Sequence, residues 1–370
     1  MRPKDPFIGR SILDGQFEII QKIGTGGMGS VYKALQPAMN RMVAIKILHP
    51  KLAGRKDLTS RFRREARAMS QLTHPHTTKV FMYGELPEDG SLYIVMEYLE
   101  GRNLNQTVRK GGPMPVERAI PILVAVCGAL HEAHTMGIVH RDLKPENIFL
   151  CTQGGLSDYP KVLDFGLAKV TERQMRPGSI ILTQEGMVFG TPEFMSPEQA
   201  QGKTLDPRSD IYSLAVILYE VLTGKLPFLA KTPMEYIQKH VLEEPIPLGQ
   251  RVEGQSFPEG LWPVLAQALA KKPDDRFQTA SDFAIALETA VGGLPAAQSL
   301  PASSLRPRSD PRLPVAGAAP VSSDQQPPSA QQPAAPSRLP IGLLVGVAAT
   351  FLLVGVLLAL LVMRFLMTTS

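Results

Sequence analysis

The eight residues His140 to Asn147, His-Arg-Asp-Leu-Lys-Pro-Glu-Asn, constrain this chain more than any other stretch. They follow residues 116–134, whose apolar side chains recur every three or four positions and therefore predict a core helix. Within the stretch, Asp142 can accept the proton of an attacking hydroxyl group. Asn147 offers an oxygen to Mg²⁺, and Lys144 offers a positive charge to a transferring phosphate. This chemistry predicts a site for a nucleotide triphosphate.

Two residues outside this stretch complete the pattern. Asp164 begins Asp-Phe-Gly, 17 residues after Asn147, and offers a second hard oxygen ligand. Lys46 ends the strand-like run 43–46, 96 residues before Asp142. A lone lysine in a strand is usually a solvated surface residue. Lys46 is therefore a candidate site residue only because Asp142 and Asp164 are also present. Together these residues predict phosphoryl transfer.

At these positions the chain resembles the protein kinase family, and most closely its eukaryotic-like bacterial serine/threonine members. Residues 140–147 match the catalytic loop and 164–166 the metal-binding loop. Lys144 followed by Pro-Glu-Asn is similar to the serine/threonine branch. The resemblance covers about residues 17 to 285 and implies an α+β, two-lobed kinase fold that uses ATP and Mg²⁺. It implies a β-rich N-lobe at about 17–97, a helical C-lobe at about 98–285, catalytic roles for Asp142, Lys144 and Lys46, and metal ligation by Asn147 and Asp164.

A glycine-rich loop lies upstream. Residues 17–23 alternate as a strand and lead into Gly24-Thr25-Gly26-Gly27-Met28-Gly29, where glycines allow backbone amides to approach phosphates. The same spacing opens Rossmann domains, but there a helix follows, with an acidic residue about 20 positions on. Here residues 31–34 form a second strand pattern and position 49 is His49. A hairpin of the kinase kind is therefore predicted.

The resemblance also implies a set of ATP contacts. Glu65 lies beside the helical stripe Leu58, Phe62, Ala66, Met69 and Leu72, and as a kinase residue it would pair with Lys46; alone it would be a surface charge. Met96 would be the gatekeeper, and the backbones of Glu97 and Leu99 would bind adenine. The full predicted set is Ile23, Gly24, Thr25, Gly26, Gly27, Met28, Gly29, Ser30, Val31, Ala44, Lys46, Glu65, Met96, Glu97, Leu99, Asn147 and Asp164.

The resemblance also implies supporting contacts in the C-lobe. A buried Glu198, in Ser-Pro-Glu, should pair with Arg276, because a lone buried carboxylate is costly. Asp210, before the apolar run 211–222, should anchor the catalytic loop backbone, cap a helix, or both. Residues 151–160 read as a surface insertion. His131 and His134 lie near the stripe of the core helix, where packing or surface roles outweigh metal ligation without a third ligand.

Activation by phosphorylation is expected between Gly166 and Thr191, because a phosphate there would neutralise Arg141 and order the segment. Thr183 is the first candidate and Ser179 the second. Thr191 is disfavoured, since by resemblance its hydroxyl lies against Asp142 and Lys144.

Composition changes sharply outside this region. Residues 1–16 read as an N-terminal extension, and residues 1–11 have no apolar run of the signal-peptide kind. Residues 293–340 contain 11 of the 33 prolines and not one aromatic residue, which predicts a disordered linker rich in Pro, Ala, Ser and Gln. Residues 341–363 have Thr350 as their one polar side chain, and a helix of this length spans about 34 Å, which predicts a transmembrane helix.

Residues 364–370 would then form a short extracytoplasmic tail. Arg338 and Arg364 flank the span evenly, so charge does not set its orientation, but the use of ATP favours a cytoplasmic kinase domain at the inner face of the plasma membrane. Gly342 and Gly346 open a small-residue face that suggests a homodimer.

The remaining composition sets broad limits. The net charge of +5 is mild and fits an ordinary basic surface or attraction to anionic partners. We expect protein substrates and no nucleic-acid partner. The two cysteines, Cys127 and Cys151, lack metal-ligand spacing and favour a reducing compartment.

Two other classes compete with an active protein kinase. A pseudokinase would be a membrane-displayed binding module, but the chain retains Lys46, Asp142, Asn147 and Asp164. A small-molecule kinase would share the catalytic aspartate. The runs Gly-Thr-Pro-Glu at 190–193 and Ser-Pro-Glu at 196–198 favour a protein acceptor, because they resemble a peptide-positioning loop.

Overall fold

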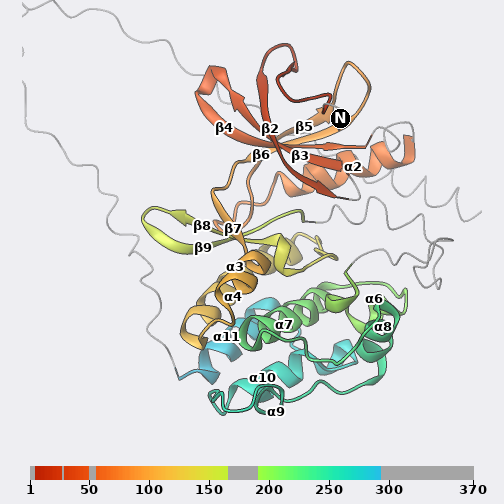
Figure 1. Cartoon of the computed structure of the whole chain (residues 1–370). Helices are drawn as coiled ribbons and strands as arrows, with labels where there is room; N and C mark the ends of the chain where they lie inside the picture. Colours follow the sequence, from red (N-terminus) through yellow and green to blue (C-terminus); the bar gives the residue numbers. More distant parts are fainter. Residues whose placement is uncertain (1–4, 27–28, 50–55, 166–190, 293–370) are drawn as a thin grey trace, which may run out of the picture. The chain divides into compact units, whose positions relative to one another are not determined.

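The computed structural model describes residues 5–26, 29–49, 56–165 and 191–292. Residues 5–97 form a lobe built on a β-sheet, and the residues that follow form a mainly helical lobe (Figure 1). The predicted two-lobed α+β architecture is therefore confirmed. The predicted linker and membrane segment lie outside the described residues.

The sheet of the N-lobe is antiparallel throughout and runs in the order β1-β2-β3-β4-β6-β5. Its strands are β1 (Ser11–Ile12), β2 (Phe17–Gly26), β3 (Gly29–Gln36), β4 (Arg41–Leu48), β5 (Val80–Glu85) and β6 (Leu92–Glu97), with the short helix η1 (Pro37–Met39) between β3 and β4. The strands predicted at 17–23, 31–34 and 43–46 are present as β2, β3 and β4, each longer than predicted. β2 and β3 form the predicted hairpin.

The register of these strands puts the predicted nucleotide residues on one face. Gly24 pairs with Val31, Val31 with Lys46, and Lys46 with Ile94. Directly paired residues share a face of the sheet, so this row crosses four strands. A second row contains Lys33, Ala44 and Met96. The opposite face buries Phe17, Ile19, Tyr32 and Ile45 in the core of the lobe.

Helix α2 (Lys56–Met69) packs against strands β5 and β6. Its predicted stripe, Leu58, Phe62, Ala66 and Met69, is buried, and Leu72 is buried just beyond the end of the helix. Full burial of a large apolar side chain contributes roughly 1.5 to 3 kcal/mol. The stripe therefore fixes which face of α2 meets the sheet, and Glu65 lies on that side with 6% of its surface exposed.

The C-lobe is organised around helix α7 (Pro207–Thr223), which is buried on nearly all sides, as expected of a central core helix. Helix α4 (Val116–Thr135), the predicted core helix, packs against α7 and α11. The other helices are α3 (Leu104–Gly111), α6 (Pro197–Ala200), α8 (Pro233–Leu242), α9 (Leu248–Arg251), α10 (Leu261–Ala268) and α11 (Ala280–Ala290), with short η2 (Pro145–Asn147), η3 (Pro192–Phe194) and η4 (Pro273–Asp275).

The segment 151–160, interpreted as a surface insertion, belongs to a paired hairpin. Strands β7 (Gly101–Asn103), β8 (Ile148–Gln153) and β9 (Leu156–Val162) form a second antiparallel sheet. Gly154 and Gly155 have positive φ and make the turn. Asp158 forms a bidentate pair with Arg118, at 2.8 and 3.0 Å, which ties the hairpin to α4. Residues 152–157 are exposed, as predicted for a surface insertion, while Cys151 and Pro160 at its two ends are buried.

Part of the N-terminal extension packs on the sheet. β1 pairs with β2, and Ile12 and Leu13 are buried in the core of the lobe. Asp5 accepts from the Tyr32 hydroxyl at 3.2 Å and pairs with Lys22 at 3.2 Å. Residues 5–13 thus cover the outer edge of β2, which the sequence pattern did not indicate.

None of the helices in the described ranges is both long and apolar enough to span a bilayer. The predicted span 341–363 is not among those ranges, so it stays a prediction.

Candidate active site

Asp210 anchors the backbone of the catalytic loop, residues 140–147. Its carboxylate accepts from the backbone amides of His140 at 2.8 Å and Arg141 at 3.0 Å. His134, on α4, bonds the same carboxylate through Nε2 at 2.8 Å. Burial alone would raise the pKa of Asp210, but these bonds hold the pKa below its ordinary value. The predicted anchoring role is confirmed.

The alternative role of Asp210, as a helix cap, is wrong. Helix α7 begins at Pro207, and its N-cap is Asp206, whose side chain accepts from the amide of Arg208. The apolar run had suggested a later start, because the first turn of α7 is polar. Asp210 lies inside that turn with its side chain turned toward the loop.

Two non-glycine residues of the site have left-handed backbones. Arg141 has φ of 70° and Asp164 has φ of 58°. Such conformations cost on the order of 1 to 3 kcal/mol when the surrounding structure enforces them, and they gather at functional sites. At Arg141 that enforcement includes the Asp210 bond and a bond from Gln199 Nε2 to the Arg141 carbonyl at 2.9 Å.

Asp142 is fixed by its own loop. Lys144 Nζ lies 2.7 Å from Oδ2 of Asp142, and Asn147 Nδ2 donates to the Asp142 carbonyl at 2.7 Å. The Asp142 side chain is 38% exposed, so a hydroxyl group from solution can reach the carboxylate. Lys144 lies where it can contact the same incoming group. The loop therefore joins a proton acceptor to a cation, as predicted.

Lys46 pairs with Asp164 across the two lobes. Nζ of Lys46 is 2.8 Å from Oδ2 of Asp164. Burial would raise the pKa of Asp164, but Lys46, with His140 and Lys144, holds the pKa below its usual range. The Asp164 carboxylate is therefore ionised near neutral pH.

The predicted pair between Lys46 and Glu65 is not present among the described side chains. Glu65 is buried on α2 and lies 3.4 Å from Nη2 of its neighbour Arg64. Lys46 instead meets Asp164, because a partly buried carboxylate at this position requires a cation. This is a correction to the predicted partner of Lys46, although both residues occupy the expected elements.

Asn147 and Asp164 fit the predicted Mg²⁺ site. The Asn147 amide group is used as a donor to Asp142, which leaves its oxygen as the atom able to bind a metal. Asp164 contributes an ionised carboxylate. Mg²⁺ in nucleotide sites takes one or two protein oxygens and completes its shell with phosphates and waters. Within the described residues there is no group of three or more His, Cys, Asp or Glu side chains that could hold a metal ion.

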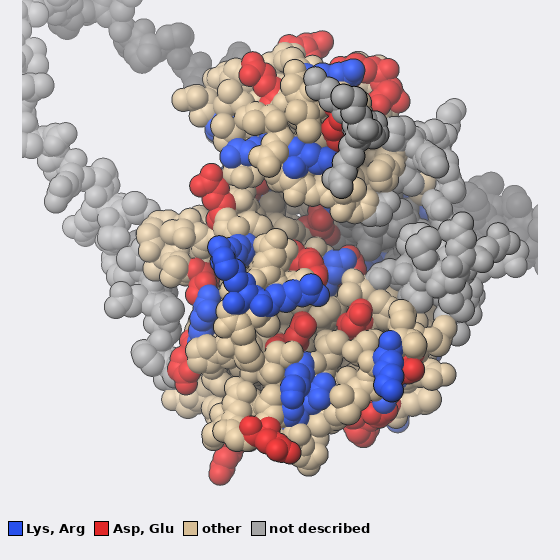
Figure 2. Space-filling view, in the orientation of Figure 1, with Lys and Arg blue, Asp and Glu red and all other residues tan. Residues whose placement is uncertain are grey.

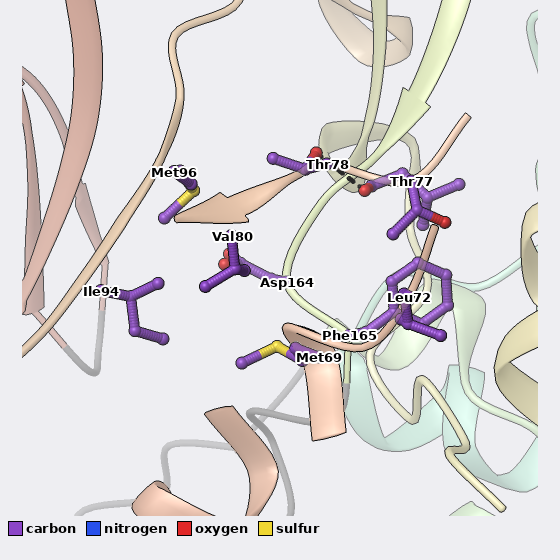
Figure 3. Close-up of a pocket in the computed structure, with 10 residues that line it drawn as sticks. Met69, Leu72, Thr77, Thr78, Val80, Ile94, Met96, Asp164 and Phe165 are labelled. Carbon is purple, nitrogen blue, oxygen red and sulfur yellow. Dashed lines mark hydrogen bonds between the residues drawn. The ribbon is translucent and has the colours of Figure 1, made fainter. Parts of the chain in front are cut away.

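A small pocket lies next to Asp164. Met96 and Ile94, from β6, face Asp164 and Phe165 across it, and Val80 lies between (Figure 3). Met69, Leu72, Thr77, Thr78 and Val162 complete the lining. Met96 therefore lies at the back of the site, as a gatekeeper would. Figure 2 shows the surface hollowed between the two lobes in front of it.

The phosphate-loop glycines are not equivalent. A Cβ on Gly29 would lie 2.1 Å from the Ile47 carbonyl, so β3 can approach β4 only if this residue is glycine. Gly24 would meet only Val31 at ordinary contact distance, and Gly26 faces open space. Both are therefore free of packing constraints, as a phosphate-facing backbone requires. Gly27 and Met28 lie outside the described residues.

The other residues of the predicted ATP set lie on β2, β3, β4, β6 and the connection that follows β6. Ile23 is exposed on β2, where the register shifts between Lys22 and Gly24, and Ala44 is buried and paired with Met96. Glu97 ends β6, and Leu99 follows in the connection to the C-lobe. The Glu97 side chain also accepts from the buried Lys161 at 2.8 Å and from the Lys79 amide at 2.7 Å. This connection is therefore held by a pair that the sequence did not reveal.

A second hollow adjoins Asp142 on the other side. Its lining is Arg141, Asp142, Leu143, Thr191, Phe194, Met195 and Gln199. Thr191 thus lies near the catalytic aspartate, as predicted. Beyond the hollow, Arg276 donates to both oxygens of Glu198 at 2.8 Å. This predicted buried pair is confirmed. Thr183 and Ser179 lie outside the described residues.

Sequence reasoning missed three supporting residues. Gln199 and Lys161 have no local signal, because their partners are backbone or side-chain groups distant in sequence. His134 was considered only for packing, surface or metal roles. Its position at the end of an apolar helix, six residues before His140, was the one available clue.

An acidic group also flanks the catalytic loop. Burial, reinforced by the nearby carboxylates of Glu146 and Glu193, raises the pKa of Glu220 to about 7. A raised carboxyl pKa means that its contribution to stability is present at low pH and is lost as pH rises through 7. Ionised Glu220 therefore destabilises the fold at alkaline pH.

Glu220→Gln is expected to stabilise the protein by on the order of 1 to 3 kcal/mol at pH 8, and by less at pH 6. Thermal unfolding of both proteins at the two pH values measures the difference. Glu253→Gln, at an exposed position, is the matched control and should change neither value. An equal gain for Glu220→Gln at pH 6 and pH 8 would contradict the assignment.

The two-lobed fold and this set of side chains define a phosphotransferase of the kinase class. Residues 17–284 match the protein kinase domain family, and the chain belongs to that family. It is 40% identical over 284 residues to the serine/threonine-protein kinase pkn3 of Myxococcus xanthus. The alignment covers 77% of this chain and 51% of that protein. The chain is 41% identical over 285 residues to PknB of Mycobacterium leprae, covering 76% of this chain and 44% of that protein.

Among solved structures, the kinase domain of PknI from Mycobacterium tuberculosis aligns with a TM-score of 0.59 and 28% identity. The alignment covers 77% of this chain and 98% of that domain. The chain spans about half or less of the length of the curated relatives it matches. These similarities place the chain among the eukaryotic-like bacterial serine/threonine kinases.

Proposed function

We propose that this chain is an active serine/threonine protein kinase that transfers the γ-phosphate of ATP to protein hydroxyl groups in bacterial signal transduction. The carrying observation is the convergence of three elements: Asp142 with Lys144 on the catalytic loop, Asp164 before Phe165, and Lys46 on β4. Asp142 orients the acceptor hydroxyl and takes its proton, while Lys144 offsets charge on the transferring group. Mg²⁺ bound by Asn147 and Asp164 would supply charge neutralisation at the phosphates.

The second hollow supports a protein acceptor. Thr191, Phe194 and Met195 line this hollow beside Asp142, and a wall formed by one stretch of chain suits an extended peptide more than a small amino alcohol. The protein's own segment between residues 166 and 191 is included among the proposed acceptors, with Thr183 and Ser179 favoured.

Incubating the full chain with ATP, Mg²⁺ and peptides that each contain one serine, threonine or tyrosine tests this proposal. We expect phosphate on serine and threonine peptides, and little on tyrosine. Phosphate found only on an added aminoglycoside or on choline would support a small-molecule kinase instead. No phosphate on any acceptor, with ATP still bound, would support the pseudokinase alternative.

The proposal includes anchoring by residues 341–363, with the kinase domain on the cytoplasmic side of the inner membrane. Its support is the length and apolarity of this run. Gly342, Gly346 and Thr350 repeat every four residues, and close helix approach along such a face drives association in lipid. Two tethered kinase domains would reach an effective concentration approaching ~mM.

Replacing Gly342 and Gly346 together by isoleucine is expected to make autophosphorylation of the membrane-embedded full chain depend on its surface density. The native protein should show little such dependence, because its partner is already bound. Reconstitution at several protein-to-lipid ratios, with crosslinking, measures this. Leu343→Ile with Val347→Ile has the same spacing on a neighbouring face and is the control. Unchanged dimer yield and rate in the glycine variant would leave the helix as an anchor alone.

A further inference from the structure

Two consecutive carbonyl groups beside the catalytic loop are held by side chains from different helices. Nε2 of His240, on α8, lies 3.0 Å from the carbonyl oxygen of Glu193. Oγ of Ser213, on α7, donates to the carbonyl of Phe194 at 2.8 Å. Both carbonyls belong to η3, which carries the wall of the hollow next to Asp142. The position of this wall is therefore set by two hydrogen bonds from the core of the C-lobe.

The partners of His240 determine its tautomer. A carbonyl oxygen only accepts, so Nε2 must carry the proton that bonds Glu193. The other nitrogen, Nδ1, lies 2.9 Å from the Tyr212 hydroxyl, which then donates to it. Burial, helped by the nearby Lys271 ammonium, lowers the pKa of His240 to about 3, so the ring is neutral. A neutral ring with one donor and one acceptor satisfies both partners.

The surroundings of His240 are rigid. The side chain is fully buried, and its ring meets Phe228 edge-on with centroids 4.9 Å apart. Nζ of Lys271 donates to the carbonyls of Lys239 and His240 at 3.3 and 3.1 Å, and lies 4.6 Å from the centre of the Phe228 ring. This brace holds the last turn of α8. These contacts therefore hold the imidazole ring in place for its hydrogen bond to the Glu193 carbonyl.

Packing alone does not require a histidine here. A buried polar ring without partners is costly, whereas phenylalanine would fill a similar volume without that cost. The two nitrogens are useful because one of them satisfies a carbonyl of η3. The segment that follows η3 is anchored separately, through Glu198 and Arg276. His240 thus fixes the part of the segment nearest to Asp142.

We propose that His240 is a positioning residue for the protein acceptor: its Nε2–H bond to the Glu193 carbonyl sets the wall against which the substrate backbone lies beside Asp142. This inference rests on the proposed protein kinase function. His240 contacts neither ATP nor the acceptor hydroxyl in this role. Its loss should therefore weaken peptide use and leave ATP use unchanged.

Two substitutions separate the two nitrogens. His240→Gln places an amide nitrogen three bonds from Cβ, where Nε2 lies, and can keep the bond to Glu193. His240→Asn places polar atoms where Nδ1 lies, so it keeps only the hydrogen bond with the Tyr212 hydroxyl. The experiment compares KM for a threonine peptide, KM for ATP, and thermal unfolding in the full chain. Tyr212→Phe, which removes the other hydrogen bond, is the control.

We expect His240→Asn to raise the peptide KM about tenfold, because the Glu193 carbonyl loses its donor. KM for ATP should stay constant, and His240→Gln should recover most of the loss. Tyr212→Phe should lower the unfolding temperature without changing the peptide KM. Ser213→Ala releases the adjacent Phe194 carbonyl and should give the same peptide-specific loss, which provides the test if His240→Asn does not fold.

The contrary results are distinct. If His240→Asn, or Ser213→Ala in its place, is folded and has the native peptide KM, the positioning role is wrong. Equal losses in His240→Gln and His240→Asn would mean that the ring acts through packing, which also overturns the inference. If the unmodified chain phosphorylates no peptide while it binds ATP, the proposed function itself has failed, and the inference falls with it.

Discussion

Asp142→Asn is expected to reduce phosphoryl transfer by about 10²- to 10⁴-fold, because the acceptor hydroxyl loses its proton acceptor while the site keeps its shape. Asparagine keeps the size of the side chain and an oxygen for Lys144, which lies 2.7 Å from the native carboxylate. The loop backbone is held independently by Asp210. The loss should therefore appear in kcat, with KM for ATP nearly constant.

Single-turnover transfer to a threonine peptide by the full chain measures this effect. Asp275→Asn, at an exposed position on η4, is the matched control and should have native activity. An Asp142→Asn protein with more than half of the native rate would exclude Asp142 as the proton acceptor.

Arg276→Met is expected to destabilise the protein by about 3 to 5 kcal/mol, because it leaves the Glu198 carboxylate buried without its cation. Arg276 is fully buried, and it also donates to the carbonyls of Ala270, Arg208 and Lys271. Burial would raise the pKa of Glu198, but the Arg276 guanidinium holds the pKa below its ordinary value. Without Arg276, burial should raise the pKa of Glu198.

Chemical denaturation of the full chain, followed by a signal from the C-lobe, measures the change. Arg63→Met removes the same type of side chain from an exposed pair with Glu85, and should cost no more than about 1 kcal/mol. Adding Glu198→Gln to Arg276→Met should recover part of the loss, because the buried charge is removed. Equal destabilisation by Arg276→Met and Arg63→Met would contradict a buried ion pair.

Local sequence pattern predicted most of the fold that positions the site. The alternation at 17–23 and the stripe of α2 are set by which residues are buried, and burial repeats at the period of the element. The pair of Glu198 with Arg276 was implied by the resemblance to the kinase family, and its physical reason is that a buried carboxylate requires a cation. Each of these predictions depends on one requirement: the burial of apolar side chains within an element, or the compensation of one buried charge.

Contacts between distant segments were harder to predict. Lys46 pairs with Asp164 and not with Glu65, which the resemblance implied, and no local pattern in the sequence ranks one of these carboxylates above the other. The bonds of Gln199 to Arg141 and of His240 to Glu193 join side chains to backbone carbonyls, and any residue supplies a carbonyl. The packing of residues 5–13 on β2 depends on an edge that exists only once the sheet has formed.

Comparison of ATP binding with phosphate transfer in the full chain, for the native protein and for Lys46→Met, tests the central claim most directly. We expect the native chain to place phosphate from ATP on serine or threonine residues, and Lys46→Met to lose nearly all of this transfer while remaining folded. If the native chain is folded and binds ATP with Mg²⁺ but transfers no phosphate to itself or to any peptide, the residues around Asp142 do not form a catalytic site.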